Sequence, residues 1–232
     1  MLTELGIAGE TVNPSPARTV DELIGIGIDK GYSTIVAAGN DHHLNKTFSA
    51  FANVSKNLPT AGQKTVLGFI PINPGGAMID TLGYGQDLTV SLANLKFRKI
   101  RDFNVMTIEP NKHFLSQIQM SVARPIKLVG EINNFKIEAM ATDLVLNSQM
   151  VLKLYNSHIG NNWLRRSCNW LVGKPSGQEI NKSVFSGYLM RLETPGVAAP
   201  LVLDDEVIAK TPILASLSES TIKIIDLSLR RG

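Results

Sequence analysis

The sequence predicts a protein of the α/β class with two parts, a doubly wound α/β domain and, after it, a mostly antiparallel β domain. In the first part, segments with apolar residues at helical spacing alternate with short β-branched runs, which is typical of a parallel sheet covered by helices. From about residue 97, short alternating segments are separated by Gly, Pro and Asn, which is typical of antiparallel strands. We therefore expect an α/β domain over residues 1–95 and a β domain over residues 96–232.

The α/β pattern begins with a helix, a strand and a second helix. The helix is expected over residues 17–31, because apolar residues recur there at offsets of three, four and eight: Val20, Leu23, Ile24 and Ile28. Residues 33–38, "STIVAA", form a β-branched run that we interpret as a buried strand. Helical spacing returns after the next turn, at Leu44, Thr47, Phe48 and Phe51.

The same pattern follows a second time. Residues 64–72, "KTVLGFIPI", predict another buried strand, "NPGG" a turn, and "AMIDTLG" a short helix that ends at Gly83. Ligands of open α/β sheets bind beyond the carboxyl ends of the strands. Both turns come at such ends, so we expect them to lie together.

The second half contains two segments of a different kind. Residues 156–183 are polar, carry both tryptophans and have no clear period, so we interpret them as a long irregular insertion in the β domain, which the last strands complete. The basic run "KFRKIR" at 96–101 is typical of a solvated strand edge, and contact with anionic lipid is the alternative.

Composition limits the classes of function. The chain has 232 residues, of which 44% are hydrophobic, and this is enough for a sizeable core. Its net charge of +3 is small, so we do not expect a nucleic-acid partner. Cys168 is the only cysteine, and the sequence has neither a signal peptide pattern nor an apolar run of about 18 residues. We therefore expect a cytoplasmic protein without a membrane span.

The first turn, "AGNDHH", has the features of a phosphate-binding turn. Gly39 lets backbone N–H groups approach an anion, the following helix presents its positive end, and Asp41 could orient magnesium or a nucleotide hydroxyl. The alternative is that Asn40 or Asp41 only caps the helix. In the second turn, Gly75 and Gly76 permit close backbone approach, whereas the preceding proline removes one donor.

Three further groups of residues are of types that occur in metal or catalytic sites. Adjacent side chains point apart, so His42 and His43 do not predict a metal site. Cys168 and His158 lack an orienting partner and are a poor nucleophile and base pair. The carboxylates in "LVLDDEVI", which belong to Asp204, Asp205 and Glu206, predict either an ordinary acidic hairpin or a general base.

In this order, the pieces resemble the diacylglycerol kinase catalytic-domain family, which includes YegS-type lipid kinases and sphingosine kinases. The family's first turn reads G-G-D-G-T-L-N-E, and this chain matches it at Gly39, Asp41, Leu44 and Asn45. Its second turn, P-x-G-T-G-N-D-F-A-x-x-L-G, corresponds to "PINPGGAMIDTLG" at 71–83, where Pro71, Gly75, Leu82 and Gly83 are retained. The family's C-terminal "R-I-E-T-P" and acidic hairpin resemble "RLETP" at 191–195 and the hairpin that ends at Glu206.

The resemblance implies a nucleotide-binding α/β domain, a second domain of the β-sandwich type, and ATP with magnesium as cofactors. It implies that nucleotide is contacted at the two turns, by Gly39, Asn40, Asp41, Gly75 and Gly76, and that Asp41 helps to hold magnesium. Glu206 would be the base that deprotonates the hydroxyl of a lipid at a membrane surface. The implied activity is that of an ATP- and magnesium-dependent lipid kinase.

The chain also departs from the family pattern. It lacks the usual first strand and glycine-containing loop, and the sheet edge left by that absence would favour strand exchange or a homodimer. Asn40 and His42 replace glycines of the first turn, and Ala77 replaces a carboxylate of the second. A catalytically silent binding or regulatory module is therefore the main alternative, and a kinase of a soluble dinucleotide is another.

Overall fold

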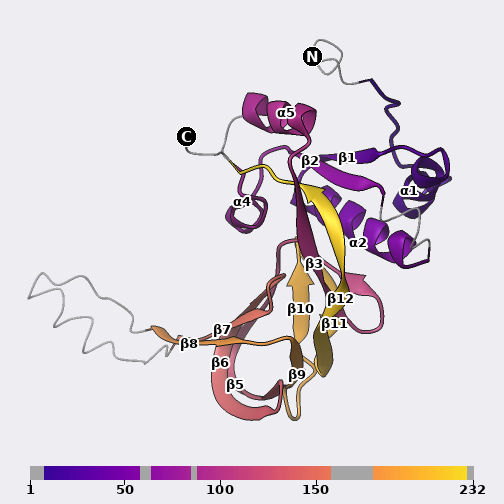
Figure 1. Ribbon diagram of the computed structural model, residues 1–232. Helices are drawn as coiled ribbons and strands as arrows, with labels where there is room; N and C mark the ends of the chain where they lie inside the picture. The colour runs from indigo at the N-terminus through magenta and orange to yellow at the C-terminus, as the bar shows by residue number, and fades with distance from the viewer. Residues whose placement is uncertain (1–7, 58–63, 85–87, 158–179, 229–232) are drawn as a thin grey trace, which may run out of the picture. The chain divides into compact units, whose positions relative to one another are not determined.

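The computed structural model describes residues 8–57, 64–84, 88–157 and 180–228 (Figure 1). The chain divides into two compact units, one made of Met1–Gln117 with Ala215–Gly232 and the other of Ile118–Leu214. The first is an α/β unit and the second consists of antiparallel strands, so the predicted fold class is confirmed. We call them the α/β unit and the β unit.

The α/β unit is built on parallel strands with an antiparallel extension. Its elements in chain order are α1 (Val20–Asp29), β1 (Thr34–Gly39), α2 (Asp41–Asn57), β2 (Val66–Pro71), α4 (Gly76–Leu82), α5 (Leu88–Phe97), β3 (Ile100–Ile108), β4 (Lys112–His113) and most of β12 (Ile213–Ile225). β1 pairs with β2 in parallel without a break in register, and β12 continues the sheet in parallel with β2. β3 then pairs with β12 in the antiparallel sense.

The first helix forms as its apolar spacing predicts. Val20, Ile24 and Ile28 are buried along one face of α1. A capping box begins the helix, because the Thr19 hydroxyl accepts a hydrogen bond from the Glu22 N–H and the Glu22 carboxylate accepts one from the Thr19 N–H. These local signals explain why this helix could be read from the sequence.

The core of the α/β unit lies where helices cover the strands. Leu44, Phe48 and Phe51 of α2 are almost fully buried, as expected from their spacing. The Phe48 ring meets the Phe103 ring of β3 edge-on, with 5.5 Å between the ring centroids. On the strand β2, Leu67 and Phe69 are also fully buried.

Two expectations for this unit are wrong. β1 is not a buried strand, because Ala37 alone among its residues is buried and Val36 is 41% exposed. The basic run at 96–101 is not one strand either, since residues 96 and 97 end α5 and β3 begins at Ile100.

The α/β unit also extends beyond residue 95, where we expected it to end. Residues 96–117 belong to the α/β unit, because β3 starts there and pairs along β12. The expectation that the last strands complete the β domain fails for β12, whose residues from Ala215 onward pair with β3 and β2.

The β unit is formed by hairpins. Its strands are β5 (Gln117–Ile132), β6 (Phe135–Asn147), β7 (Val151–Ser157), β8 (Ile180–Ser186), β9 (Leu189–Glu193), β10 (Pro200–Leu203) and β11 (Glu206–Lys210). β6 pairs with β7, and β7 pairs with β8. β5 pairs with β6, β9 and β10. The ends of the predicted insertion are strand residues of β7 and β8, whereas residues 158–179, with His158, Cys168 and both tryptophans, lie outside the described residues.

Candidate functional site

The first turn connects β1 to α2 and is fixed by a helix cap. Asn40 Oδ1 accepts a hydrogen bond from the His43 N–H at 3.1 Å, and the Asn40 carbonyl accepts one from the Leu44 N–H at 3.0 Å. Asn40 is thus the N-cap of α2, which is one of the two roles that the sequence left open for it. One amide at this helix end is therefore satisfied within the chain.

Gly39 is required at this turn by a neighbouring side chain. A Cβ atom at this position would lie 2.9 Å from the Cβ atom of His43, closer than carbon atoms approach. The space that the missing side chain leaves is thus used by His43. The close contact at Gly39 is therefore with the His43 side chain, whereas the motif predicts a contact with a phosphate.

The second turn lies beside the first. The Ile72 N–H, directly after β2, donates to the Gly39 carbonyl at 2.8 Å. Gly75 is the N-cap of α4 and has no side chain with which to cap it. The prediction that both turns lie together, at the carboxyl ends of adjacent parallel strands, is confirmed.

Asp41 links the two turns directly. Its Oδ2 atom accepts a hydrogen bond from the Gly75 N–H at 3.0 Å. A Cβ atom at Gly75 would lie 2.8 Å from the same carboxylate oxygen, so this contact requires glycine. Three of the residues that the resemblance assigns to nucleotide binding, Asn40, Asp41 and Gly75, therefore lie at these two connected turns.

The second oxygen of Asp41 has a different environment. Oδ1 is buried and has no hydrogen-bond partner among the described residues. Leaving a buried acceptor without a partner costs about 1–3 kcal/mol, and a bound cation or donor would recover it. The Oδ1 atom of Asp41 is thus the candidate for contact with a metal ion.

The donor set fits magnesium only if a nucleotide supplies other ligands. No group of three or more His, Cys, Asp or Glu residues that could hold a metal occurs in the described part of the chain. Magnesium in nucleotide sites commonly takes one or two carboxylates and completes its shell with phosphate oxygens and water. Asp41 meets that requirement for a magnesium–nucleotide complex, but not for a protein-only site.

Asn45 has a structural role that the sequence reasoning missed. Its side chain is 2% exposed, and Oδ1 accepts hydrogen bonds from the Leu115 N–H at 2.8 Å and the Ser116 N–H at 3.3 Å. Its Nδ2 atom donates to Ser116 Oγ at 3.0 Å. Asn45 therefore holds α2, which begins at the first turn, against the segment after β4. Its match to the motif was the signal that could have suggested a role.

His113 of β4 is buried and contacts a later part of α2. Nε2 lies 3.2 Å from Asn53 Oδ1, and Nδ1 lies 3.1 Å from Thr107 Oγ1 and 3.4 Å from the Met106 carbonyl oxygen. Burial lowers the pKa of His113 and nearby Lys56 lowers it further, against the opposite effect of the Met106 carbonyl. His113 thus joins α2 to β3 and β4 as an uncharged group.

The acidic residues near the C-terminus form the predicted hairpin. Leu203 of β10 pairs with Glu206 of β11, so Asp204 and Asp205 form a two-residue turn. Both have positive φ angles, of 47° and 67°, as a type I′ turn requires. Glu206 is exposed at the start of β11.

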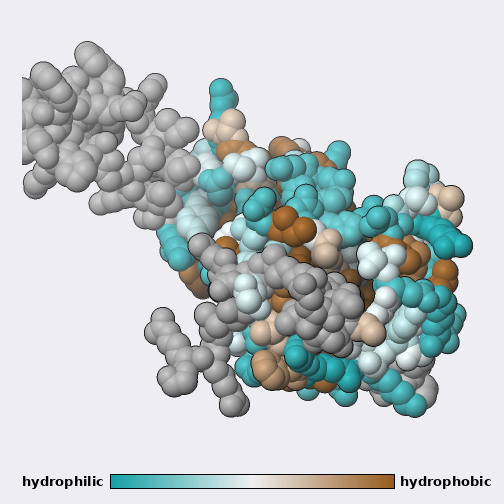
Figure 2. Space-filling view, turned by 90° about the horizontal axis from the view of Figure 1, so that it is seen from above, coloured by the Kyte–Doolittle hydropathy of each residue, from teal (hydrophilic) through white to brown (hydrophobic). Residues whose placement is uncertain are grey.

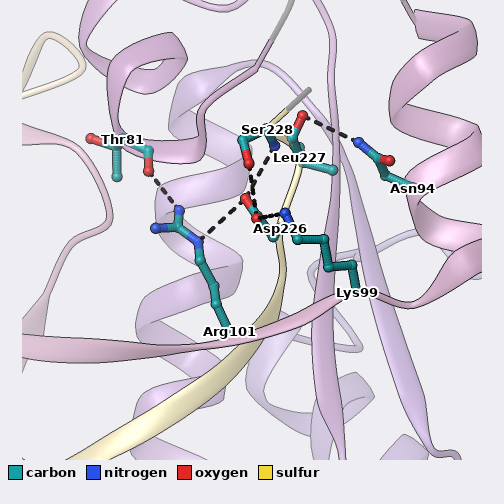
Figure 3. A network of polar contacts seen from close by, with 7 residues as sticks. All are labelled: Thr81, Asn94, Lys99, Arg101, Asp226, Leu227 and Ser228. Carbon is teal, nitrogen blue, oxygen red and sulfur yellow. Dashed lines mark hydrogen bonds and ion pairs between the residues drawn. The ribbon is translucent and has the colours of Figure 1, made fainter. Parts of the chain in front are cut away.

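The basic residues at 98–101 are used within the α/β unit. The Lys99 ammonium lies 2.6 Å from Asp226 Oδ2, and the Arg101 guanidinium donates to the Thr81 carbonyl at 2.7 Å (Figure 3). Burial works to raise the pKa of Asp226, but hydrogen bonds from Lys99 and Ser228 outweigh it and hold that pKa below its ordinary value. Arg98 donates to the Ser33 carbonyl at 2.7 Å. These contacts tie the chain after β12 to β3 and α4, which a solvated strand edge would not do.

The surface in Figure 2 and one hollow of the β unit are the remaining features of interest. On the face in Figure 2, hydrophobic residues are scattered among hydrophilic ones, and no helix in the described ranges is long and apolar enough to cross a membrane. The β unit has a hollow of about 210 Å³ between β5, β6 and β7, lined by Gln119, Met120, Ser121, Asp143, Leu144, Val145 and Tyr155. Asp143 accepts hydrogen bonds from the hydroxyls of Ser121 and Thr142 there, each at 2.7 Å.

The fold of this chain is similar to the folds of two solved proteins that are named as kinases. A solved structure of a diacylglycerol kinase from Bacillus anthracis str. Sterne superposes with a TM-score of 0.67 at 13% identity, over 92% of this chain and 84% of that one. An NAD kinase from Archaeoglobus fulgidus, solved in complex with ATP, superposes with a TM-score of 0.52 at 15% identity, over 97% and 86% of the two chains. The chain therefore has the fold of diacylglycerol kinases and NAD kinases. No family model and no curated protein sequence matches it.

Proposed function

We propose that this protein is an ATP- and magnesium-dependent lipid kinase that transfers the γ-phosphate to a lipid hydroxyl. The observation that carries the proposal is Asp41, which bridges the two turns through Gly75 and keeps a second, buried oxygen without a partner among the described residues. Such an oxygen suits a magnesium ion that a nucleotide brings with it. The fold similarity to diacylglycerol kinases and to an NAD kinase with bound ATP supports the class of reaction.

In this proposal, different residues of the chain bind the nucleotide and accept the proton. The lipid hydroxyl oxygen attacks the γ-phosphorus, the bond from that phosphorus to the ADP oxygen breaks, and Glu206 accepts the hydroxyl proton. Asp41 would hold the magnesium–nucleotide complex, and the turns at Gly39 and at Gly75–Gly76 would contact the nucleotide. Positioning and charge neutralisation supply most of the catalysis in phosphoryl transfer. Magnesium, when bound, neutralises the charge on the phosphate oxygens.

The apolar part of the lipid is assigned to the hollow of the β unit. Met120, Leu144 and Val145 line it together with the ring of Tyr155. Both oxygens of Asp143 are engaged by hydroxyl groups, so this carboxylate is held in place. Localisation at a membrane surface would follow from such a substrate.

The test of this function is phosphate transfer from labelled ATP to vesicles that contain diacylglycerol, with NAD as a soluble acceptor in a parallel reaction. We predict transfer to the lipid only, and a fall in kcat of about 100-fold or more for Glu206→Gln, because general bases contribute about that much. Asp205→Asn is the matched control, since it changes a carboxylate of the same exposed hairpin at a position where asparagine suits the positive φ. Equal loss in both variants, or transfer to NAD alone, would contradict the assignment.

A second candidate function has its own structural support. The His43 and Gly75 amides, which a phosphate would use, are occupied by Asn40 and Asp41. In a catalytically silent binding or regulatory module, these two amides would stay bonded within the chain. In that case Mg-ATP at a concentration suited to a kinase would not raise the melting temperature, whereas a ligand at 100 times its Kd adds about 2.7 kcal/mol of stability.

A further inference from the structure

The hollow between β5, β6 and β7 contains a fixed carboxylate that a ligand can reach. Asp143 Oδ1 accepts a hydrogen bond from the Ser121 hydroxyl, and Oδ2 accepts one from the Thr142 hydroxyl, each at 2.7 Å. A carboxylate has about four acceptor positions, so these two bonds leave places for further donors. Asp143 lines the hollow and is only partly buried. The N–H groups of a ligand can therefore bind to it.

Asp143 has no ionic partner within the described part of the β unit. The ion pairs found there join Lys127 to Glu138 and Arg191 to Glu193. A divalent metal is a poor partner, because it needs about six oxygen ligands and the described residues hold no group of three or more metal-binding side chains. An ammonium group needs only a few acceptors, so it is the cation that this carboxylate suits.

An aromatic ring and two lysines lie on the same face of the sheet as Asp143. Tyr155 is directly opposite Asp143 in the pairing of β6 with β7, and residues so placed share a face. Lys182 is opposite Tyr155 on the neighbouring strand β8, with its ammonium 6.0 Å from the centroid of that ring (Figure 1). Lys153 precedes Tyr155 by two positions, so it lies on this face as well.

The spacing of these charges suits a ligand that carries both signs of charge. Neighbouring strands lie about 4.8 Å apart, so the backbones of Asp143 and Lys182 are roughly 10 Å apart. Lys153 is diagonal to Asp143, at about 7–8 Å. The carboxylate is bonded to Ser121 on β5, away from β7 and β8, and it makes no ion pair with either lysine in the described structure. Both signs of charge are thus open to a ligand that spans the Tyr155 ring.

We propose that this face binds a zwitterion with a primary ammonium and a phosphate group, the chemistry of an ethanolamine phospholipid head group and of free phosphoethanolamine. The ammonium donates to Asp143, and the phosphate lies toward Lys153 and Lys182, since lysine is a common binder of phosphate. The methylene groups between them contact the Tyr155 ring. The apolar residues that line the hollow stay available to an acyl chain. The head group as source rests on the proposed function, which has its substrate at a membrane surface.

The test is an NMR titration of the full chain with phosphoethanolamine, ethanolamine and inorganic phosphate, observed at the amides of Asp143, Tyr155 and Lys182. We expect a Kd for phosphoethanolamine about tenfold or more below that of either half, because only the whole molecule meets both signs of charge. ATP, magnesium and acceptor lipid are left out, so an absence of kinase activity does not affect the result. Equal Kd values for phosphoethanolamine and one of its halves, or no saturable shifts, would overturn the proposal.

Asp143→Asn removes the charge and can keep the internal contacts. Ser121 can donate to the amide oxygen, and the amide nitrogen can donate to Thr142, whose proton then turns to the Tyr155 carbonyl at 3.2 Å. We expect the Kd of phosphoethanolamine to rise roughly tenfold or more, to that of inorganic phosphate. Glu131→Gln, which changes an exposed carboxylate of β5 outside the hollow, is the matched control and leaves the Kd unchanged. An unchanged Kd in Asp143→Asn contradicts the assignment, and the three ligands on the wild type decide if this variant does not fold.

Sedimentation with vesicles distinguishes the two sources of the zwitterion. We expect the full chain to sediment with phosphatidylcholine vesicles that contain phosphatidylethanolamine, less so for Lys182→Gln, and not with phosphatidylcholine alone, whose ammonium has no N–H donor. Equal sedimentation with both vesicles would contradict the role of the primary ammonium. Binding of free phosphoethanolamine without sedimentation would overturn the head group as source and support a soluble ligand at the same site.

Discussion

Asp41, Asn45 and Asn53 hold α2 in place at three positions along its length through polar side-chain contacts. Asp41 accepts from the Gly75 N–H, Asn45 binds Leu115 and Ser116, and Asn53 meets His113. All three contacts join residues far apart in the sequence. Sequence reasoning identified Asp41 from its motif, but it assigned no role to the other two, because a partner 60 or more positions away leaves no local pattern.

His113 makes the stability of the α/β unit depend on pH. Its pKa in the folded chain lies below the ordinary value of 6.5, so the unfolded chain binds a proton first as the pH falls. Stability is therefore full above about pH 6.5 and decreases as the pH falls from there toward the lower pKa of the folded chain. We expect His113→Gln, which retains a side-chain donor, to lose this component of the dependence.

The measurement is the free energy of unfolding in urea, for wild type and His113→Gln at pH values from 7.5 down to 5. Other histidines contribute equally to both proteins, so the difference between the two curves isolates His113. A difference that stays constant with pH would show that the folded and unfolded chains bind this proton alike.

At the scale of elements, the sequence predicted what local patterns determine. α1 has a regular apolar stripe and a capping box, and both turns carry glycine. α5 was missed, because its Thr, Val, Ser and Asn residues are weak helix formers and the helix depends on packing of Leu92 and Leu95. β1 was expected to be buried because its β-branched residues suit a central strand, whereas its place at the edge is a property of strand order.

The packing of α5 on β2 gives a prediction at this scale. A Cβ atom at Gly68 would lie 2.7 Å from Leu95 Cδ2, so Gly68→Ala forces the Leu95 side chain out of its present position. We expect a loss of about 1–3 kcal/mol in the free energy of unfolding. The matched control is Gly25→Ala in α1, where an added Cβ meets nothing within 4 Å, and we expect a gain of about 0.5–1 kcal/mol.

Chemical denaturation of both variants measures this difference. A Gly68→Ala protein as stable as the wild type would mean that the Leu95 side chain is not held against Gly68 as described. Loss of stability in Gly25→Ala would instead point to a general intolerance of glycine replacement.

At the scale of the whole molecule, the order of the strands brings the two turns together. Alternating helices and strands predicted that the two turns lie together at the carboxyl ends of β1 and β2, and they do. The bond between Asp41 and Gly75 could not be predicted, because the motif places Asp41 toward a nucleotide and not toward the neighbouring turn. The division into units was misjudged at β3 and β12, since their pairing is known only once the chain is folded.

Calorimetric titration with Mg-ATP tests the central claim, that the turns joined by Asp41 form a nucleotide site, most directly. We predict measurable binding to the wild type and a Kd roughly 10- to 100-fold higher for Asp41→Asn, which loses the charged contact to magnesium. Asp80→Asn, which changes an exposed carboxylate of α4, should bind as the wild type does. Absence of binding heat in the wild type, or equal affinity in Asp41→Asn, would contradict the account.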